Sequence, residues 1–490
     1  MRKTKIVCTI GPSSFAPEIV EEMIRLGMDV ARVNFSHGSR AEYRTICANV
    51  RKAARRLDKV VGLLADIPGP KLRITDLSAP VLELSEDELI GVVESDSLAH
   101  VTPIGHVDAM VSTTTLGVVS QLQVGNRISF ADGVVQAEVV EVISGGAVAA
   151  RVTIAGTLTP RKGVNFPDSH VKIPALTPKD KELIEFACEE RFDFIAISFV
   201  GSAFDMIEAR EVVNRHSEFN KPRLVAKIER PSALKEIREI IMNSDAVMVA
   251  RGDLGVEIAP EDVPIEQKRI IHLCNEIGKP VITATQMLES MVHAPLPTRA
   301  EATDVATAIF DGTDAIMLSA ETAAGEFPLE SVSYMDRIAR RAETELTNVS
   351  LTHLERPLPL THTVADAIAL SAQQICSTLP IKAVVAVTES GHSARVISKF
   401  RPDVEVLGAA ATAEAAGSLT LSFGVTPFVL HSSFRGEEAM LEAVNKTIEM
   451  KLAKNGDLVL VVAGIPFGVS GRTNLLKVQV VGEPVFEQDR

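Results

Sequence analysis

The chain has 490 residues, of which 46% are hydrophobic and 23% are charged, and its net charge is −14. This length predicts about two to four domains, and the negative charge disfavours nucleic acids and anionic membranes as partners, since both bind cationic surfaces. Five cysteines without a Cys-x-x-Cys spacing, and no long apolar segment, predict a cytoplasmic protein without disulfides, structural zinc or a membrane span.

Eight short apolar runs alternate with helical segments along much of the chain. The runs are residues 5–10, 30–35, 61–67, 194–199, 224–229, 246–253, 281–286 and 315–321. This alternation predicts an α/β fold with a (β/α)8 catalytic barrel over residues 1–69 and 171–346, and an active site at the carboxyl ends of its strands. The alternative is a doubly wound open sheet, which alternation alone does not exclude.

Residues 70–170 interrupt the alternation after the third strand. They have almost no helical period and contain short β-like pieces separated by Gly and Asp. They predict a small β-barrel lid domain, inserted in a strand-to-helix loop above the catalytic face. After a Pro-rich linker at 356–363, apolar runs again alternate with helical segments. Residues 347–490 are therefore predicted to form a C-terminal α/β domain for effector binding and oligomerisation.

The second predicted strand ends in Arg-Val-Asn-Phe-Ser-His-Gly. Arg32, Asn34 and Ser36 alternate onto one face of this strand, and His37 follows them. An arginine at this edge suits a phosphate or carboxylate ligand. The alternative is an arginine that only covers a surface.

The fifth and sixth predicted strands end in charged residues. Lys227 and Glu229 lie two positions apart and share a face, and Asp253 follows the next strand. Two carboxylates from neighbouring strand ends suit Mg²⁺, with water and substrate oxygens completing its shell. The alternative is a structural Asp-Glu-Lys salt-bridge cluster. Asp253 also ends an Arg-Gly-Asp tripeptide at 251–253, which is known from cell adhesion, but its place behind a buried strand favours a barrel site.

The last two predicted barrel strands end in small polar or acidic residues. Thr285 has the chemistry to bond a substrate carboxylate or relay a proton, or simply to satisfy backbone groups, while Ser319 and Glu321 are expected to orient neighbours. The strand ends together offer a metal site, cations and hydrogen-bond donors, without a Ser-His-Asp arrangement. This set favours phosphoryl transfer, in which positioning and charge neutralisation supply most of the catalysis.

Motifs along essentially the whole chain resemble those of pyruvate kinases. They are KIVCTIGPSS, ARVNFSHG, RKGVNFP, VKIPALTPKDKEL, AKIERPSAL, VMVARGDLGVE, ITATQMLESM, PTRAEATDVATAIFDGTDAIMLSAETAAGEFP and TESGHSARVISKFRP. The resemblance implies the barrel, lid and C-terminal domain described above. It also implies the last step of glycolysis, in which phosphoenolpyruvate and ADP give pyruvate and ATP with Mg²⁺ or Mn²⁺, and a homotetramer.

The resemblance also implies roles for individual residues. Lys227 would neutralise charge on the transferring phosphoryl group, and Arg32 would bind that phosphate. The backbone N–H groups of Gly252 and Asp253, together with Thr285, would hold the substrate carboxylate at the start of a helix. Thr285 would also help to protonate the enolpyruvate, through water.

The remaining implied sites hold a metal, a nucleotide and a monovalent cation. Glu229 and Asp253 match the divalent-metal ligands. The nucleotide phosphates would lie near Asn34, Ser36, His37 and Arg73, and the monovalent-cation pocket would use Asn34, Ser36 and Asp66. Lys71 stands where potassium-dependent members carry glutamate, so its ammonium is predicted to replace a bound K⁺. Ser202 stands where many members have a nucleotide-contacting lysine, which puts that contact in doubt.

In the C-terminal domain, the sequence Thr-Glu-Ser-Gly-His-Ser follows a strand and opens a helix. Thr388, Ser390 and Ser393, with helix N–H groups, match the family's position for a sugar-phosphate effector, and a nucleotide effector is a further possibility. The alternative is capping of the helix by Ser390 or Ser393.

Two rival functions are set against the kinase. One is another phosphoenolpyruvate-handling barrel, such as a lyase or mutase, which would lack the lid and the C-terminal domain. The other is a non-catalytic pyruvate-kinase-like protein that binds effectors or serves as a scaffold. That rival predicts losses at Lys227, Glu229 or Asp253, and the sequence keeps all three.

Overall fold

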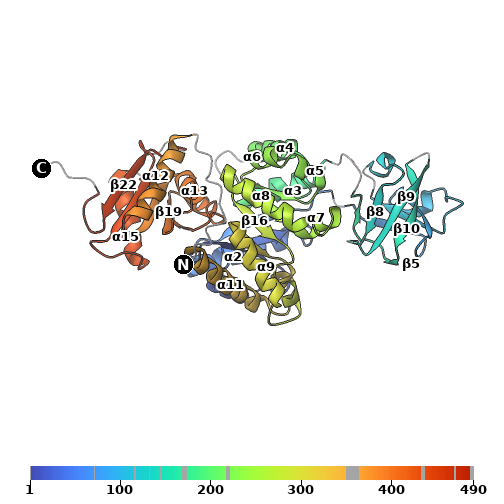
Figure 1. The fold of residues 1–490 in the computed structure, drawn as a ribbon, viewed down its shortest axis with the longest axis horizontal. Helices are drawn as coiled ribbons and strands as arrows, with labels where there is room; N and C mark the ends of the chain where they lie inside the picture. Colours follow the sequence, from blue (N-terminus) through green and yellow to red (C-terminus); the bar gives the residue numbers. More distant parts are fainter. Residues whose placement is uncertain are drawn as a thin grey trace.

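The computed structural model describes residues 2–485 except 71, 115–116, 132, 144–145, 168–173, 217–220, 349–362, 432–435 and 468–470. Three parts lie in a row in Figure 1, with the barrel in the middle, the cyan β-rich part on one side and the orange-red C-terminal part on the other. Almost all of the linker predicted at 356–363 lies outside the described residues. Among the helices of the described part, none is long and apolar enough to cross a membrane.

Eight parallel strands form a closed barrel in the order β1-β17-β16-β15-β14-β13-β3-β2. They are β1 Lys5–Thr9, β2 Val30–Asn34, β3 Gly62–Ile67, β13 Phe194–Ile197, β14 Arg223–Ile228, β15 Ala246–Ala250, β16 Val281–Ala284 and β17 Ala315–Leu318. All eight predicted strands are confirmed, and the open-sheet alternative is wrong. Because all the strands run parallel, their polar carboxyl-terminal residues meet at one end of the barrel.

Helices surround the barrel and form an aliphatic core against it. They are α1 Pro17–Leu26, α2 Arg40–Arg56, α3 Pro178–Glu189, α4 Ala203–His216, α5 Pro231–Lys235, α6 Ile237–Asn243, α7 Arg251–Glu257, α8 Val263–Ile277, α9 Arg299–Asp311, α10 Ala320–Ala323 and α11 Pro328–Asn348, with a 3-10 turn at Glu289–Val292. Capping boxes at Ser39, Thr177 and Thr298 start three of these helices. Left-handed glycines, Gly278 and Gly312, end two of them.

The inserted part is a barrel-like β structure with its own core. Its strands are β4 Ile74–Leu77, β5 Leu82–Leu84, β6 Leu89–Glu94, β7 Ala109–Thr113, β8 Arg127–Phe130, β9 Val135–Ile143, β10 Ala147–Ile154, β11 Gly156–Leu158 and β12 Val164–Asn165, with 3-10 turns at Leu98–His100 and Val119–Gln121. Asn165 Nδ2 donates to Glu257 Oε1 at 2.6 Å. Since Glu257 lies on α7, just past the carboxyl end of β15, the lid contacts the barrel at its catalytic end.

The C-terminal part is a five-stranded sheet with helices on both faces (Figure 1). Its strands are β18 Ile381–Thr388, β19 Glu405–Ala410, β20 Val425–Val429, β21 Leu458–Ala463 and β22 Leu475–Val480, and its helices are α12 Val364–Thr378, α13 His392–Lys399, α14 Ala413–Gly417 and α15 Gly436–Glu449. The strand order is β20-β19-β18-β21-β22, and only β22 pairs antiparallel. The predicted α/β domain is confirmed.

The C-terminal part closes the amino end of the barrel. Leu421 is 1% exposed and packs among the residues that fill the barrel interior. Lys5 Nζ donates to the Val425 carbonyl at 2.7 Å, and Arg401 Nη2 donates to Asp314 Oδ1 at 2.7 Å. The two ends of the barrel are therefore covered by different domains, and the carboxyl ends of the strands face the lid.

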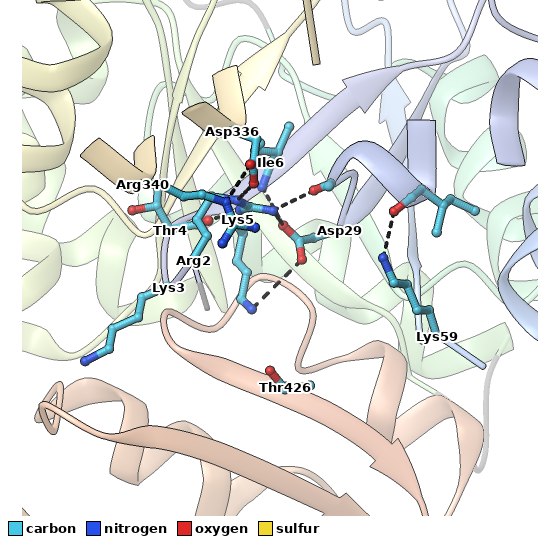
Figure 2. A network of polar contacts seen from close by, with 12 residues as sticks. Arg2, Lys3, Thr4, Lys5, Ile6, Asp29, Lys59, Asp336, Arg340 and Thr426 are labelled. Atoms are coloured by element: carbon cyan, nitrogen blue, oxygen red, sulfur yellow. Dashed lines mark hydrogen bonds and ion pairs between the residues drawn. The ribbon is translucent and has the colours of Figure 1, made fainter. Parts of the chain in front are cut away.

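A polar network supports the amino end of the barrel (Figure 2). Arg2 Nη2 lies 2.8 Å from Asp29 Oδ2, and Arg2 Nε lies 2.9 Å from Asp336 Oδ1. Asp29 Oδ2 also accepts the Ile6 amide at 2.8 Å, and Lys5 Nζ is 4.0 Å from Asp29 Oδ1. The network therefore ties the chain before β1 to the start of β2 and to α11.

Asp193, in the turn before β13, lies where α14 of the C-terminal domain comes close to the barrel. Its Oδ2 accepts the Leu63 amide at 2.8 Å. A Cβ atom added to Gly417 would lie only 1.9 Å from Asp193 Oδ1, so a larger residue at this point of α14 would force the two parts to shift. Burial raises the pKa of Asp193 to about 7.

We expect Asp193 to make the protein less stable as the pH rises from 5 to 8. Its folded-state pKa of about 7 exceeds the ordinary value of 3.8, so between these values the native state keeps a proton that the unfolded state loses. The stabilisation is complete below the unfolded pKa and is lost as the pH rises through about 7. Asp193→Asn should therefore show a smaller drop in melting temperature between pH 5 and pH 8 than the wild type. Equal drops would contradict this role.

Candidate active site

Five polar side chains meet at the carboxyl ends of four adjacent strands, β2, β3, β13 and β14. Arg32 Nε lies 2.7 Å from Asp66 Oδ2. Lys227 Nζ lies 3.2 Å from Asp66 Oδ1 and 2.9 Å from Glu229 Oε1. It also donates to Ser198 Oγ at 2.7 Å. The parallel register brings these groups together, because each side chain comes from the last residues of its strand or from the residue just after it.

Lys227 and Asp66 each favour the charged form of the other. Burial alone would lower the pKa of Lys227, but the carboxylates of Asp66 and Glu229 outweigh it and raise the pKa above its usual value. Burial would likewise raise the pKa of Asp66, yet Lys227 and Arg32 hold it below its usual value. Lys227 is therefore a permanent ammonium in a site almost closed to water.

Glu229 and Asp253 are two carboxylates near enough for the charge of Asp253 to act on Glu229. Glu229 is 0% exposed, and burial, with Asp253 as a further cause, raises its pKa. Its Oε2 accepts the Phe199 amide at 2.6 Å, whereas Oε1 has only the Lys227 ion pair, without hydrogen-bond geometry. A buried carboxylate with an oxygen short of hydrogen bonds, beside a second carboxylate, fits a hard divalent cation. No group of three or more His, Cys, Asp or Glu residues suited to a metal occurs in the described part of the chain.

The ion pair predicted as the structural alternative is also present. Lys227 and Glu229 do pair, so the salt bridge and the metal hypothesis use the same residues. The charge of Asp253 acts on both members of the pair. The geometry is thus compatible with both interpretations of these residues.

Thr285 lies against the start of α7. Its Oγ1 accepts the Gly252 amide at 2.8 Å and donates to the Ala284 carbonyl at 2.6 Å. The φ angle of Thr285 is 67°, in the left-handed region that β-branched residues rarely adopt. Such strain persists where the surroundings enforce it, often at functional sites. The arrangement places the Thr285 hydroxyl beside the first amides of α7, as the sequence predicted.

Arg251 holds the backbone of Thr285 in this conformation. Its Nη1 pairs with Asp304 Oδ2 on α9 at 2.7 Å, and its Nη2 donates to the Thr285 carbonyl at 2.6 Å. The Arg251 side chain is only 10% exposed. The Arg-Gly-Asp tripeptide therefore begins α7, and the side chain of its arginine is turned into the protein. The tripeptide is not an exposed loop tip, so the adhesion interpretation is wrong. The contacts by which Arg251 positions Thr285 were not predicted from the sequence, where Arg251 stood out only as part of the tripeptide.

The predicted nucleotide residues lie at the edge of the cluster. Asn34 Oδ1 accepts the Ser36 amide at 3.1 Å, and Ser36 and His37 are exposed. Arg73 lies at the entry to the lid, where its Nη1 donates to the Arg161 carbonyl at 2.9 Å.

Two further residues bear on the predicted cation and nucleotide sites. Asn34 is in register with Asp66 on the neighbouring strand, but the Asp66 side chain contacts Arg32, Lys227 and Ser198. Lys71 lies outside the described residues. Ser202 N donates to Asp205 Oδ2 at 2.9 Å, which satisfies the first turn of α4.

Glu321 orients the loops after the last two strands. It is 0% exposed, its Oε2 accepts the Ser319 amide at 2.7 Å, and its Oε1 accepts the Leu288 amide at 3.1 Å. Glu321 thus has the predicted orienting contacts, whereas the Ser319 hydroxyl has no hydrogen-bond partner among the described residues.

The loop predicted to bind an effector has unsatisfied polar groups. Thr388 is 2% exposed, and its hydroxyl has no hydrogen-bond partner among the described residues. Ser393 Oγ bonds Thr473 Oγ1 at 2.8 Å, and the N-cap of α13 is Gly391, without a side-chain capping bond. Capping by Ser390 or Ser393 is therefore wrong as the alternative explanation of this motif.

The contact of Ser198 with Lys227 and the ion pairs of Asp66 were not predicted from the sequence. Ser198 follows β13 and receives the Lys227 ammonium, and Asp66 joins Lys227 to Arg32 rather than only lining a cation pocket. The position of Ser198 directly after the fourth strand was the available signal. The shared carboxylate was not readable, because it depends on the order of strands around the barrel.

The chain is similar to known proteins along most of its length. The family model "Pyruvate kinase, barrel domain" matches residues 1–332, and "Pyruvate kinase, alpha/beta domain" matches residues 366–479. The pyruvate kinase of Sporosarcina psychrophila is 43% identical over 487 residues, covering 99% of this chain and 81% of that protein. A pyruvate kinase of Staphylococcus aureus strain USA300 is 41% identical over 486 residues, with the same coverage. A crystal structure of a pyruvate kinase from Cryptosporidium parvum has a TM-score of 0.89 and 34% identity, covering 98% and 96% of the two chains.

Proposed function

This chain belongs to the pyruvate kinase family, and on that premise we propose that the cluster around Lys227 performs its phosphoryl transfer. The reaction moves the phosphoryl group of phosphoenolpyruvate to ADP and gives pyruvate and ATP. The observation that carries the assignment is the Lys227 ammonium, 2.9 Å from Glu229 and 3.2 Å from Asp66 at the carboxyl end of the barrel. The lid and C-terminal domain argue against a lyase or mutase. The intact charged cluster argues against a scaffold without catalysis.

Lys227 and Arg32 would hold the phosphoryl group as it transfers. Arg32 lies on β2 with its guanidinium fixed by Asp66 at 2.7 Å and by the Thr9 hydroxyl at 2.8 Å. Both cations are thus positioned before a substrate arrives. Charge that is already in place stabilises the transition state without reorganisation during the reaction.

Glu229 and Asp253 would hold the divalent cation, Mg²⁺ or Mn²⁺. When bound, the cation neutralises charge on phosphoryl and carboxylate oxygens. The protein's part is to bury one carboxylate completely and to fix its orientation through the Phe199 amide at 2.6 Å. That rigidity favours a defined coordination geometry over a diffuse negative surface.

Thr285 and the amides of Gly252 and Asp253 would bind the substrate carboxylate. The Gly252 amide donates to the Thr285 hydroxyl, so the two groups lie within reach of one anion, which would take over that hydrogen bond on binding. Thr285 would also assist protonation of the enolpyruvate through water. The lid would exclude bulk water during transfer, and its Asn165–Glu257 contact with α7 supports a position over the site.

We expect equal pyruvate formation in sodium and in potassium. Lys71 would supply a fixed ammonium where a monovalent cation would otherwise bind at Asn34, Ser36 and Asp66. The assay supplies phosphoenolpyruvate, ADP and Mg²⁺, first with Na⁺ only and then with K⁺. Lys71→Glu should make the rate potassium-dependent. A wild-type rate near zero in sodium that potassium restores would overturn the lysine argument. If folded protein formed no pyruvate in either salt, even with sugar phosphates added, the catalytic assignment would be overturned.

The nucleotide site, the effector site, the domains and the assembly are also proposed from membership of the family. The nucleotide phosphates would bind near the exposed pair Ser36 and His37 together with Asn34 and Arg73. An effector would bind at Thr388, Ser390 and Ser393, which the unsatisfied Thr388 hydroxyl supports. Residues 1–69 with 171–346, 70–170 and 347–490 would act as the three domains, assembled as a homotetramer. All five cysteines are free and buried, which supports a reducing cytoplasm.

A further inference from the structure

A second cavity, of about 250 Å³, lies between the amino end of the barrel and the C-terminal domain. From the barrel, Arg223 begins β14 and Lys279 precedes β16. From the C-terminal domain, α13 supplies His392, Arg395 and Lys399. None of the residues proposed for catalysis lines this cavity. It is therefore separate from the active site, which lies at the other end of the same strands.

The cavity wall has more cationic than anionic side chains. Five lysines and arginines line it against three aspartates. Two of the aspartates pair with lining cations, Asp366 with Lys399 at 2.8 Å and Asp314 with Arg401 at 2.7 Å. These pairs leave Asp245 as the carboxylate that faces the other three cations of the wall.

Asp245 is already occupied by two arginines. Arg223 Nη1 lies 3.2 Å from Asp245 Oδ1, and Arg210 pairs with Oδ2 of the same carboxylate. Arg395 forms no ion pair with any residue that the structure describes. Its guanidinium donates to two neutral acceptors, Ser418 Oγ at 3.1 Å and the Ser390 carbonyl at 3.0 Å.

The local potential reflects this excess of positive charge. Burial and the neighbouring Arg223 lower the pKa of Arg395 to about 9. Burial, Arg395 and Arg223 also lower the pKa of His392. A buried guanidinium is costly unless an anion pairs with it. The lining thus has the chemistry of an anion site, and a phosphate group offers the oxygens that arginine forks match.

We propose that this cavity binds a small phosphate-bearing anion, with its phosphate on Arg395 and Arg223. The volume is below the roughly 300–1,000 Å³ of drug-sized ligand pockets, which favours inorganic phosphate or a small phosphate monoester. The site borders the effector loop at 388–393 and shares His392 with it, but its proposed phosphate ligands lie outside that loop. In the loop the Ser393 side chain bonds Thr473, whereas Arg395, two residues further along α13, lines the cavity.

A ligand here would connect the two domains. It would bind Arg223 of the barrel and Arg395 of the C-terminal domain at once, so it would favour the domain arrangement that keeps these residues close. Arg223 also begins the strand that carries Lys227, with Glu229 just beyond its last residue. Arg395 holds the Ser390 carbonyl of the effector loop, so an anion that recruits Arg395 would compete with that contact.

The test is calorimetric titration of inorganic phosphate into the full-length protein at constant ionic strength. Loss of one charged contact should weaken binding by about ten- to a hundredfold in Arg395→Met. The matched control is Arg341→Met, whose exposed side chain pairs with Glu345 one helical turn away. A parallel titration with glucose 6-phosphate distinguishes the two kinds of ligand. Tighter binding than that of inorganic phosphate would identify the ligand as a phosphate monoester, and weaker binding would identify it as free phosphate.

Binding in the cavity needs a measurement of its own, because phosphate also has a potential site at Arg32 and Lys227. The chain contains no tryptophan, so Ile277→Trp places a single fluorophore in the cavity wall. Phosphate should change its fluorescence, and Arg395→Met in that background should shift the midpoint upward by the same factor. Melting temperatures establish folding, and Lys279→Met replaces Arg395→Met if the latter does not fold.

Three outcomes would overturn the proposal. In the first, Arg395→Met binds phosphate as tightly as the wild type. In the second, sodium chloride at equal ionic strength produces the same fluorescence change. In the third, Ser393→Ala abolishes the response as fully as Arg395→Met, which would assign the anion to the effector loop instead. These measurements do not require turnover, so failure here is distinguishable from failure of the catalytic assignment.

Discussion

Replacing Lys227 by methionine should lower kcat by about a thousandfold or more, while phosphoenolpyruvate still binds within about tenfold of the wild-type affinity. The ammonium is held by Asp66, Glu229 and Ser198, and its raised pKa keeps it charged. Its value is greatest where charge develops on the transferring group, so the loss should fall on turnover. Steady-state kcat and KM, with calorimetric substrate binding, measure the two effects separately.

The control for this substitution is Lys235→Met, which removes an exposed lysine on α5. It should leave kcat unchanged. Lys227→Arg keeps a cation but not its compact geometry, so partial activity is expected, above that of the methionine variant. A fall of less than about tenfold in Lys227→Met, with unchanged melting temperature, would refute the assigned role.

Replacing Glu229 by glutamine should raise the Mg²⁺ concentration needed for half-maximal rate by at least about tenfold. Glutamine keeps the size of the side chain and the oxygen that accepts the Phe199 amide, but it removes the charge that a hard cation binds. Titration of activity with Mg²⁺ at saturating substrates gives the shift. Direct Mn²⁺ binding, read by electron paramagnetic resonance in the presence of phosphoenolpyruvate, should weaken in parallel.

The matched control is Glu239→Gln on α6, an exposed glutamate away from the cluster. It should leave the metal dependence unchanged. If Glu229→Gln kept the wild-type Mg²⁺ dependence and lost activity through kcat alone, Glu229 would be a partner of Lys227 and not a metal ligand. The structural salt-bridge interpretation would then be correct for this pair.

Local sequence patterns predicted the elements of the fold well. Each barrel strand was visible as a short apolar run, because strands buried on both faces carry continuous aliphatic residues. The inserted β part was visible because the helical period disappears between residues 70 and 170. Lys227, Glu229 and Asp253 were candidates because they end strands, and the carboxyl ends of parallel strands meet at one rim.

Other features depend on which elements become neighbours. The bridging of Lys227 and Arg32 by Asp66 requires β2, β3, β13 and β14 to be adjacent in the closed barrel. The contact of Arg251 with Asp304 joins residues 53 positions apart on different helices. The cavity around Arg395 exists only because α13 packs on the amino end of the barrel.

The sequence by itself determined the strands, the inserted domain, the family resemblance and the residues at the strand ends. It does so because periodicity and strand-end chemistry are local properties of a chain. Only the tertiary structure decided which carboxylate serves which cation, that Arg251 supports the Thr285 loop, and that Asp245 pairs with two arginines while the neighbouring Arg395 has neutral acceptors. The physical reason is that ion pairing and burial depend on distances in space, which are set when distant segments pack together.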